Sequence, residues 1–362
     1  MKKIYSLESL DTKITSQVRV TGEETLFLFE HAPLEWLQKR ASAIKARLHQ
    51  NDVFYNRNIH FEPTNKCVYA CKFCSFYRNP NAGISEGAWE YNEADLKMLL
   101  DKHPKDTITE IHITGGVHRD RGVKYAERLL SSIRKWRPEL HIKAFTAVEL
   151  DFFARKDHVS IQETLERLKK AGLNSLPGGG AEIFNPEIRK KIAGGKGPSY
   201  KWLSIHKAAH NQGLSSNATM LYGHIESFAH RVDHMEQLRT LQDSTCGFQA
   251  FIPLKYRNQN NALGNLAEIS EEEDLRNFCI SRIFFDNIPH LKAYWVMLGI
   301  KTAVKALDYG VDDLDGTVDD TTKIYTMAGG MESPVMTSAQ LKVLIQSAGK
   351  IPRERNSLYQ PY

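Results

Sequence analysis

The chain has 362 residues, of which 41% are hydrophobic and 25% are charged, and its formal net charge is +5. This is the composition of an ordinary globular protein. No block of lysine and arginine is long enough to predict a nucleic-acid track, and no apolar run approaches the roughly 18–20 residues that span a bilayer. The first residues include several charges instead of the apolar stretch of a signal peptide. We therefore expect a cytoplasmic protein with no nucleic-acid or membrane partner.

In chain order, residues 1–50 are expected to be mostly helical, because apolar residues recur at helical spacing after Pro33. Beyond residue 50, short β-branched or apolar runs alternate with amphipathic helical stretches, which predicts right-handed βαβ units. Eight such strands predict an α/β fold of the (β/α)8 TIM-barrel type. The predicted strands are residues 57–62, 109–114, 140–147, 173–177, 215–222, 248–253, 291–296 and 311–315. The clearest helices are residues 162–171, 200–211 and 231–242.

We expect one barrel with additions at both ends. Residues 1–50 are predicted to form an N-terminal helical extension, residues 51–320 the barrel, and residues 321–362 a C-terminal tail packed on it. Polar and glycine-rich residues follow several of the predicted strands. Because the carboxyl ends of barrel strands build the active site, this pattern predicts a single site at one mouth of the barrel.

Three cysteines directly follow the first predicted strand. Cys67, Cys71 and Cys74 form a C-x3-C-x2-C motif. Three thiolates on one short loop can bind three irons of a [4Fe-4S] cluster and leave the fourth iron without a protein ligand. An open iron can chelate S-adenosylmethionine (SAM), and the reduced cluster can then cleave it to a 5′-deoxyadenosyl radical. The motif therefore predicts a site-differentiated cluster.

A structural zinc loop is the alternative interpretation of these cysteines. Structural zinc takes four ligands, commonly from paired CxxC elements. The remaining cysteines, Cys246 and Cys279, form no second pair, although a histidine can complete such a set. We expect Cys246 and Cys279 to be small buried hydrophobic residues.

The motif and its surroundings resemble the radical SAM superfamily. The run over residues 58–78 is similar to the group that contains the menaquinone-pathway and deazaflavin enzymes, and the likeness covers roughly residues 50–345. Two features depart from the pattern: Ser75 stands where alanine is expected, and residues 192–198 are richer in glycine. We expect both to affect only local loop structure. The blocks that resemble aminofutalosine synthases in particular are residues 140–153, 175–184, 217–226 and 312–317.

This resemblance implies a radical SAM transferase. Such an enzyme adds the 5′-deoxyadenosyl radical to 3-[(1-carboxyvinyl)oxy]benzoate, giving 6-amino-6-deoxyfutalosine, methionine and bicarbonate in menaquinone biosynthesis. The resemblance also implies a [4Fe-4S] cluster with three cysteine ligands, SAM as co-substrate, and an electron donor such as flavodoxin or ferredoxin. The alternatives are a hydrogen-abstracting cyclase of the same pathway, a deazaflavin synthase half, and a non-catalytic zinc or iron–sulfur protein.

Three candidate SAM contacts lie near the motif or after the second strand. The resemblance assigns Gly115 and Gly116 to the methionine end of SAM, where a tight turn is the alternative reading. Phe73, between two of the cysteines, is expected to lie against adenine.

Three further candidates follow later strands. Glu149 and Glu182 are expected to accept hydrogen bonds from hydroxyl or amino groups of a ligand. His224, with Glu226 beside it, is expected to contact adenosine. The alternatives are a solvated glutamate for Glu149, a structural turn for Glu182 and a merely hydrogen-bonded histidine for His224.

A substrate that carries carboxylates needs cationic partners, and arginine offers bidentate geometry. The candidates are Arg78, Arg189 and Arg282, each with a surface position as the alternative. Asp313 and Asp315, by the last predicted strand, are expected either to face substrate or to end a loop.

Overall fold

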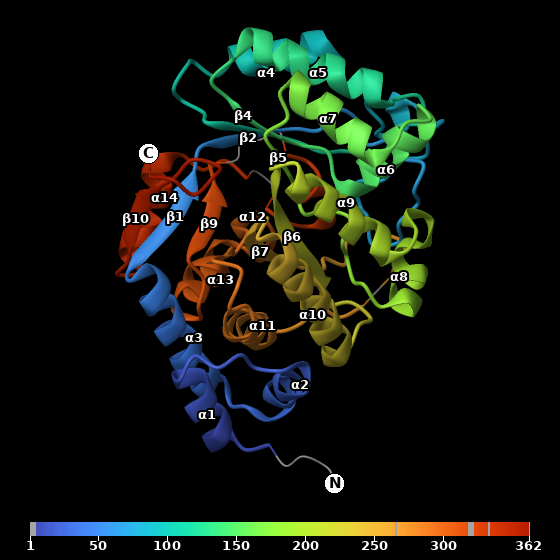
Figure 1. Cartoon of the computed structure of the whole chain (residues 1–362). Coiled ribbons are helices and arrows are strands. Elements are labelled where there is room, and N and C mark those ends of the chain that lie inside the picture. Colours follow the sequence, from blue (N-terminus) through green and yellow to red (C-terminus); the bar gives the residue numbers. More distant parts are fainter. Residues whose placement is uncertain (1–4, 265, 318–321, 332–333, 362) are drawn as a thin grey trace.

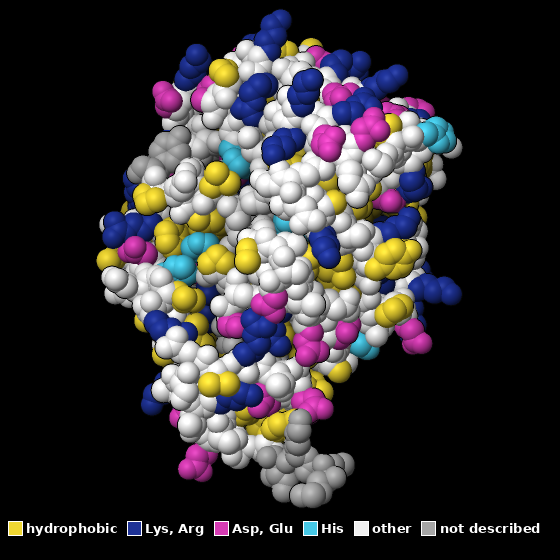
Figure 2. Space-filling view, viewed as in Figure 1, with side chains coloured by type: hydrophobic (Ala, Val, Ile, Leu, Met, Phe, Trp, Pro, Cys, Tyr) yellow, Lys and Arg dark blue, Asp and Glu magenta, His cyan; other side chains and the backbone are white. Residues whose placement is uncertain are grey.

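The computed structural model of the chain describes residues 5–264, 266–317, 322–331 and 334–361. It has an α/β architecture in which parallel strands lie in two sheets and helices cover the outside (Figure 1). None of the described helices is both long and apolar enough to cross a bilayer. On the face seen in Figure 2, Lys and Arg side chains are interspersed with Asp and Glu, so no field of a single sign covers it.

A seven-stranded parallel sheet occupies the centre of the molecule, with its strands in chain order. Each strand overlaps one of the first seven predicted strands, so the predicted parallel βαβ order is confirmed. The strands are β2 (Asn58–Phe61), β3 (Glu110–Ile113), β4 (His141–Ala144), β5 (Ser175–Leu176), β6 (Ser215–Tyr222), β7 (Phe248–Lys255) and β8 (His290–Leu291).

The eighth predicted strand belongs to a second sheet. β9 (Asp313–Gly316) pairs in parallel with β1 (Asp52–Asn56), and β10 (Ile351–Glu354) completes this three-stranded sheet on the other side of β1. One parallel bridge, between Lys292 and Asp313, links the two sheets. The expectation of a single regular eight-stranded ring is thus replaced by a curled sheet of seven strands beside a sheet of three.

The break between the two sheets has a local cause. The register between β1 and β9 shifts between Phe54 and Asn56, and the chain enters β2 only after Arg57. Beyond that point β9 reaches β2 through a side chain, because the Thr317 hydroxyl donates to the Asn58 carbonyl at 3.0 Å. A regular ladder from β9 to β2 therefore does not form.

Helices between the strands cover the sheet; α5 and α7 each bury one apolar stripe, whereas α11 is buried on nearly all sides. The helices predicted at residues 162–171, 200–211 and 231–242 are confirmed as α7, α9 and α10. The helices are α1 (Leu7–Thr15), α2 (Gly22–His31), α3 (Leu34–His49), α4 (Glu93–Asp101), α5 (Val123–Trp136), α6 (Ala147–Lys156), α7 (Ile161–Ala171), α8 (Pro186–Ala193), α9 (Ser199–Asn211), α10 (Phe228–Thr245), α11 (Glu271–Phe284), α12 (Trp295–Leu298), α13 (Ile300–Lys305) and α14 (Ser338–Ser347).

The first three helices pack on the outer helices of the sheet, at the foot of the molecule in Figure 1. α3 lies against α11, and α2 lies against both α10 and α11. α2 begins with a capping box, in which the Thr21 hydroxyl accepts from the Glu24 amide and the Glu24 carboxylate accepts from the Thr21 amide. α3 begins directly after Pro33, as the sequence predicts.

The inward-facing positions of β2 and β3 are polar. Side chains alternate between the two faces of a strand. On these strands Asn58, His60, Glu110 and His112 line an internal cavity, to which β7 adds the apolar Ile252 and Leu254. Barrels of this class usually fill the interior with branched apolar side chains. Here a cavity with both polar and apolar walls remains in the interior, which makes it the place to look for a site.

A buried ion pair fastens the two edges of the smaller sheet together. Arg355, just beyond β10, donates from Nε to the Asp313 carboxylate at 2.7 Å, and its Nη2 lies 2.6 Å from the same carboxylate in an ion pair. Both side chains are at most 1% exposed, so water does not screen the pair.

We predict that Arg355→Met lowers the free energy of unfolding by about 3–5 kcal/mol, because it leaves the buried Asp313 carboxylate without its cation. Urea unfolding measures the change. The matched control is Arg353→Met on β10, whose partner Asp52 lies at 2.9 Å but whose side chain is 55% exposed; we expect about 1 kcal/mol or less there. Equal losses in the two variants would contradict the prediction.

Candidate functional site

A single cavity at the carboxyl ends of the central strands collects most of the predicted site residues. It is lined by the three cysteines and by residues from every strand of the seven-stranded sheet or from the loop that follows it. Glu149 and His224, both predicted to contact a ligand, do not line it. The predicted residues that do are Cys67, Cys71, Phe73, Cys74, Gly115, Gly116, Glu182 and Asp315.

The cysteine loop (residues 65–78) is held in place by backbone hydrogen bonds to three other segments of the chain and by two that join its own two ends, one of them from the Arg78 amide to the Asn65 carbonyl at 2.9 Å. Backbone groups make these contacts, so they fix the course of the loop irrespective of its side chains. The other amide-to-carbonyl pairs are Cys67 with Arg78 (3.0 Å), Val68 with Val117 (2.9 Å), Lys72 with Ile192 (2.8 Å) and Leu263 with Lys72 (2.8 Å).

Ser75 adds a side-chain contact to this set. Its hydroxyl donates to the Gln259 carbonyl at 2.6 Å and is buried. An alanine here would leave that carbonyl without this partner. Where the family pattern has alanine, Ser75 thus adds one hydrogen bond to the cysteine loop. This is an effect on local loop structure, as expected.

The three thiols are shielded from water, and burial raises the pKa of each. It raises the pKa of Cys71 to about 12 and that of Cys74 to about 11, and it also raises the pKa of Cys67. The thiols are therefore protonated at neutral pH in the metal-free protein. Binding of iron must release these protons, because the thiolate is the ligand.

The spacing of the thiols does not suit a single zinc ion. Tetrahedral zinc holds its sulfur ligands about 2.3 Å from the metal and hence close to one another. Among the described residues, His49, His290 and Asp312 are the only group of three whose ligand atoms lie within 4.8 Å of one another. At least one pair of the three thiols is therefore farther apart than this limit, as ligands of separate irons in a cubane cluster are.

The group of His49, His290 and Asp312 is itself engaged in other contacts. The Asp312 carboxylate accepts from the Arg282 guanidinium and, at 2.6 Å, from His290 Nδ1. The arginine cation already neutralises this carboxylate, so we assign no metal there.

Gly115 and Gly116 line the cavity and also lie directly on the cysteine loop. A Cβ on Gly115 would stand 2.8 Å from the Thr64 carbonyl oxygen, and one on Gly116 would stand 2.4 Å from the Lys66 carbonyl oxygen. The Gly116 amide donates to Thr64 at 2.7 Å. Glycine is thus required here so that the end of β3 can approach the loop.

Glu182 faces the thiol end of the cavity, together with a lysine that sequence reasoning missed. Lys196 forms an ion pair with Glu182, and its ammonium lies 5.3 Å from the centre of the Phe73 ring. Burial lowers the pKa of Lys196, but the negative charges of Cys71 and Glu182 outweigh it and raise the pKa above its usual value. The ammonium therefore stays charged beside the thiols.

The Glu149 carboxylate is already hydrogen-bonded to other residues of the protein. Its carboxylate accepts from the Thr146 amide and hydroxyl, both at 2.8 Å, and from the Thr114 hydroxyl at 3.3 Å. These contacts form the capping box of α6. Burial raises the pKa of Glu149 to about 7, although the hydrogen bonds from Thr146 oppose the shift.

His224 and Glu226 form a turn network after β6. The Glu226 carboxylate accepts from the amides of Gly223 (2.6 Å) and His224 (2.8 Å) and from Arg231 Nε (2.8 Å). His224 Nε2 contacts the Leu221 carbonyl at 3.1 Å. Burial lowers the pKa of His224, so its ring is mainly neutral.

The three candidate arginines do not line the cavity. Arg78 donates to carbonyl groups of the cysteine loop. Arg189 donates to the carbonyls of Gly180 and Ala181, and Arg282 donates to Asp312 and nearby carbonyls. Each arginine thus satisfies backbone carbonyls instead of facing a ligand. The cationic side chains that line the cavity are Lys143, Lys196, Lys255 and Arg257.

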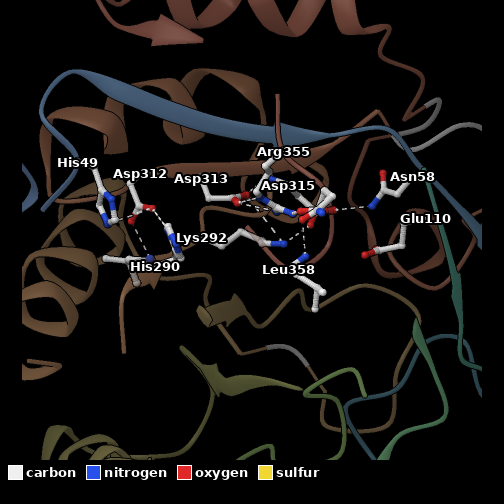
Figure 3. A network of polar contacts seen from close by, with 12 residues as sticks. His49, Asn58, Glu110, His290, Lys292, Asp312, Asp313, Asp315, Arg355 and Leu358 are labelled. Carbon is white, nitrogen blue, oxygen red and sulfur yellow. Dashed lines mark hydrogen bonds and ion pairs between the residues drawn. The ribbon is translucent and has the colours of Figure 1, made fainter. Parts of the chain in front are cut away.

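The floor of the cavity carries buried polar and charged side chains, among them Asn58, Glu110 and Asp315. These three belong to the network of polar contacts in Figure 3, whose other labelled residues lie outside the cavity lining. Lys292 pairs with Asp315, and Asn58 donates to Asp315 at 3.3 Å. Glu110 pairs with Lys143 at 2.7 Å; burial raises the pKa of Glu110, but Lys143 more than offsets this and holds it well below its usual range.

Asp313 and Asp315 differ in their surroundings. Asp315 lines the cavity, whereas Asp313 is turned to Arg355 behind it. On the same floor, the buried Nε2 of His112 has no hydrogen-bond partner in the part of the chain that the structure describes. Burial lowers the pKa of His112 far below its usual value, so the imidazole is neutral.

The two remaining cysteines lie away from the loop. Cys279 is fully buried on α11, as expected, but Cys246 is exposed at the end of α10. The prediction that Cys246 is buried is wrong, because the chain leaves the helix there in a left-handed conformation (φ 52°).

Comparison with known proteins shows the family to which the chain belongs. The profile of the Radical SAM superfamily matches residues 61–238, and that of the CofH/MqnC C-terminal region matches residues 245–362. An aminodeoxyfutalosine synthase from Thermus thermophilus is 38% identical, with 96% of this chain and 93% of the relative aligned. A cyclic dehypoxanthine futalosine synthase from Streptomyces coelicolor is 36% identical over 94% of this chain and 85% of the relative.

The fold has close counterparts among solved structures. The FeFe-hydrogenase maturase HydG from Carboxydothermus hydrogenoformans superimposes with a TM-score of 0.75 over 98% of this chain and 80% of its own, at 15% identity. Together with the sequence matches, this makes the chain a radical SAM enzyme. Within that superfamily it belongs to the family of the aminodeoxyfutalosine and cyclic dehypoxanthine futalosine synthases.

Membership of this superfamily implies a [4Fe-4S] cluster and SAM, and the cavity fits both. Three free thiols line the cavity and do not all converge on one point, which is compatible with the separate irons of a cubane cluster. The glycine-lined strand ends beside them leave backbone groups open to a ligand.

We predict that Gly116→Ala prevents cluster binding, because its Cβ forces the backbone of Lys66 away and shifts the cysteine loop. Anaerobic reconstitution followed by iron and sulfide analysis measures the loss, from about four irons per chain to less than about half of that. The control is Gly194→Ala, whose Cβ meets nothing closer than the Lys190 side chain at 3.9 Å. Full iron content in Gly116→Ala would contradict the assigned contact.

Proposed function

We propose that this protein is an aminofutalosine synthase. It joins the 5′-deoxyadenosyl group of SAM to the enol-ether double bond of 3-[(1-carboxyvinyl)oxy]benzoate, giving 6-amino-6-deoxyfutalosine, methionine and bicarbonate in menaquinone biosynthesis. The observation that carries the proposal is one cavity with three thiols at one end and a polar, partly cationic floor, in a chain that is 38% identical to aminodeoxyfutalosine synthase over nearly its whole length.

In this proposal Cys67, Cys71 and Cys74 hold the cluster, and SAM completes the coordination of the fourth iron. When bound, the cluster and SAM supply a 5′-deoxyadenosyl radical. Gly115 and Gly116 lie against SAM, with Phe73 beside the adenine. These residues line the thiol end of the cavity, which excludes water from the reacting carbon atoms.

The three remaining candidate SAM contacts differ in whether they line the cavity. Glu182 lines the cavity and can accept a hydrogen bond from a ligand. Glu149 and His224 are committed to the α6 cap and to the turn after β6. We infer that these two shape the cavity wall and leave direct contact with SAM to the other residues.

The substrate carboxylates need partners at the far end of the cavity. Lys143 has a single carboxylate partner, Glu110, for the three donors of its ammonium. Arg257 is held by Glu268 at 3.1 Å and by the Gly329 carbonyl at 2.8 Å, and it also lines the cavity. We infer that Lys143, Arg257 and the unpartnered Nε2 of His112 receive the substrate carboxylates.

The proposal also includes the domain bounds, the localisation and the electron donor that the sequence predicts. We infer that residues 51–320 form the barrel unit, with residues 1–50 as an extension and residues 321–362 as a tail packed on it; the pairing of β10 with β1 supports the packing of the tail, and the boundary at residue 320 lies outside the described residues. We infer a cytoplasmic enzyme that takes electrons from a flavodoxin or ferredoxin.

The products test the proposed reaction. Reconstituted enzyme incubated with SAM, dithionite and 3-[(1-carboxyvinyl)oxy]benzoate is expected to give an adenosine-containing adduct and methionine in equal amounts, with no free 5′-deoxyadenosine, measured by mass spectrometry. The hydrogen-abstracting alternatives release free 5′-deoxyadenosine instead. Its formation without the adduct would overturn the proposal.

The same assay tests the ligand assignment. We expect Cys71→Ala to lose the cluster and the adduct. Cys279→Ala is the matched control, because this cysteine is equally buried but lies on α11, outside the cavity. Adduct formation by Cys71→Ala at the rate of the unmodified enzyme would exclude Cys71 as a ligand.

A further inference from the structure

A short glycine-rich turn lies directly on the cysteine loop. The Ile192 carbonyl, at the end of α8, accepts from the Lys72 amide at 2.8 Å. Gly195 approaches the loop so closely that a Cβ on it would stand 3.2 Å from the Tyr69 ring. The turn Gly194–Lys196 therefore packs on the loop and delivers its last side chain to the thiol end of the cavity.

The ammonium of Lys196 is fixed there by two contacts. It pairs with the Glu182 carboxylate and lies 5.3 Å from the centre of the Phe73 ring, a residue that stands between Cys71 and Cys74 in the chain. Only 16% of the lysine side chain is exposed. Water and salt therefore screen this charge weakly.

The charge of Lys196 belongs to the same cavity as the three thiols. Lys196, Cys67, Cys71 and Cys74 all line it, and the turn that carries Lys196 packs on the cysteine loop. The other cations of the cavity are committed elsewhere: Lys143 to Glu110, Lys255 to Asp274 and Arg257 to Glu268.

We propose that Lys196 and Glu182 together set the reduction potential of the cluster on this loop. The inference rests on the proposed assignment of the three cysteines as cluster ligands. One-electron reduction adds a negative charge to the cluster, and no bond forms or breaks. A buried cation stabilises the reduced form and raises the potential, whereas the Glu182 carboxylate opposes it. Lys196 is in this sense a positioning charge and not a ligand.

The opposite signs of the two charges give a sharp test. The full chain is reconstituted anaerobically, and its midpoint potential is measured by dithionite titration followed by electron paramagnetic resonance, without SAM or substrate. We expect Lys196→Met to shift the potential downward and Glu182→Gln to shift it upward. The double variant is expected to lie between the two single variants, closer to the unmodified enzyme.

Two further variants act as controls. Lys196→Arg keeps the charge and is expected to keep the potential. Lys72→Met removes an exposed lysine next to Cys71 in the chain, and solvent screening should leave the potential unchanged. Shifts of the two single variants in the same direction, or unchanged potentials in both, would overturn the inference.

Iron content separates this inference from the proposed function. If the unmodified chain binds no cluster, the proposed function fails before any potential is measured. If only Lys196→Met fails to assemble a cluster, Glu182→Gln still decides the matter, because a potential equal to that of the unmodified enzyme would refute the role of these charges.

Discussion

The backbone hydrogen bonds that hold the cysteine loop against its neighbours are the contacts on which the site depends. They tie the loop to the segment after β3, to the end of α8 and to Leu263, so segments far apart in the chain converge on this one loop. Because amides and carbonyls make these contacts, the thiols keep their places relative to the strand ends. Gly116 belongs to the same arrangement, since only glycine allows β3 to end so close to Lys66.

The interior of the sheet contains a cavity whose floor carries buried charges. Buried ion pairs add little stability and can reduce it, compared with an apolar core. Here the acidic and basic side chains of the floor are paired, as with Glu110 and Lys143 or Asp315 and Lys292. The paired charges keep the floor polar without leaving an isolated buried ion, and His112 retains an unused nitrogen towards the cavity.

Sequence patterns predicted most of the elements and the place of the three cysteines at the carboxyl ends of the strands, because both depend on local signals. Strand alternation, helical periodicity and the C-x3-C-x2-C spacing are properties of short segments. The partners of individual polar side chains were not predictable in this way. Glu149 follows a strand as a ligand-binding residue would, yet a threonine three residues earlier recruits it into a helix cap. That capping-box spacing, Thr146 to Glu149, was the signal that could have shown it.

Lys196 and β1 were missed for different physical reasons. Lys196 lies in a glycine-rich stretch without periodicity, and only the packing of that turn on Tyr69 brings it to the thiols. β1 is a short strand of five residues, and its partners β9 and β10 lie at the other end of the chain. Closure of the sheet is therefore a long-range property that no local pattern encodes.

This pairing of distant strands has a consequence for how the chain folds. The central sheet joins consecutive strands, so each pairing closes a loop little longer than one crossover. Tyr55 on β1, by contrast, meets Glu354 on β10 across 299 positions of the chain. Contacts between residues so far apart in the chain form late during folding, because the entropy lost on closing the long loop between them must first be compensated. Until then β1 is an open strand edge, and it is there that newly made chains are most exposed to pairing with one another.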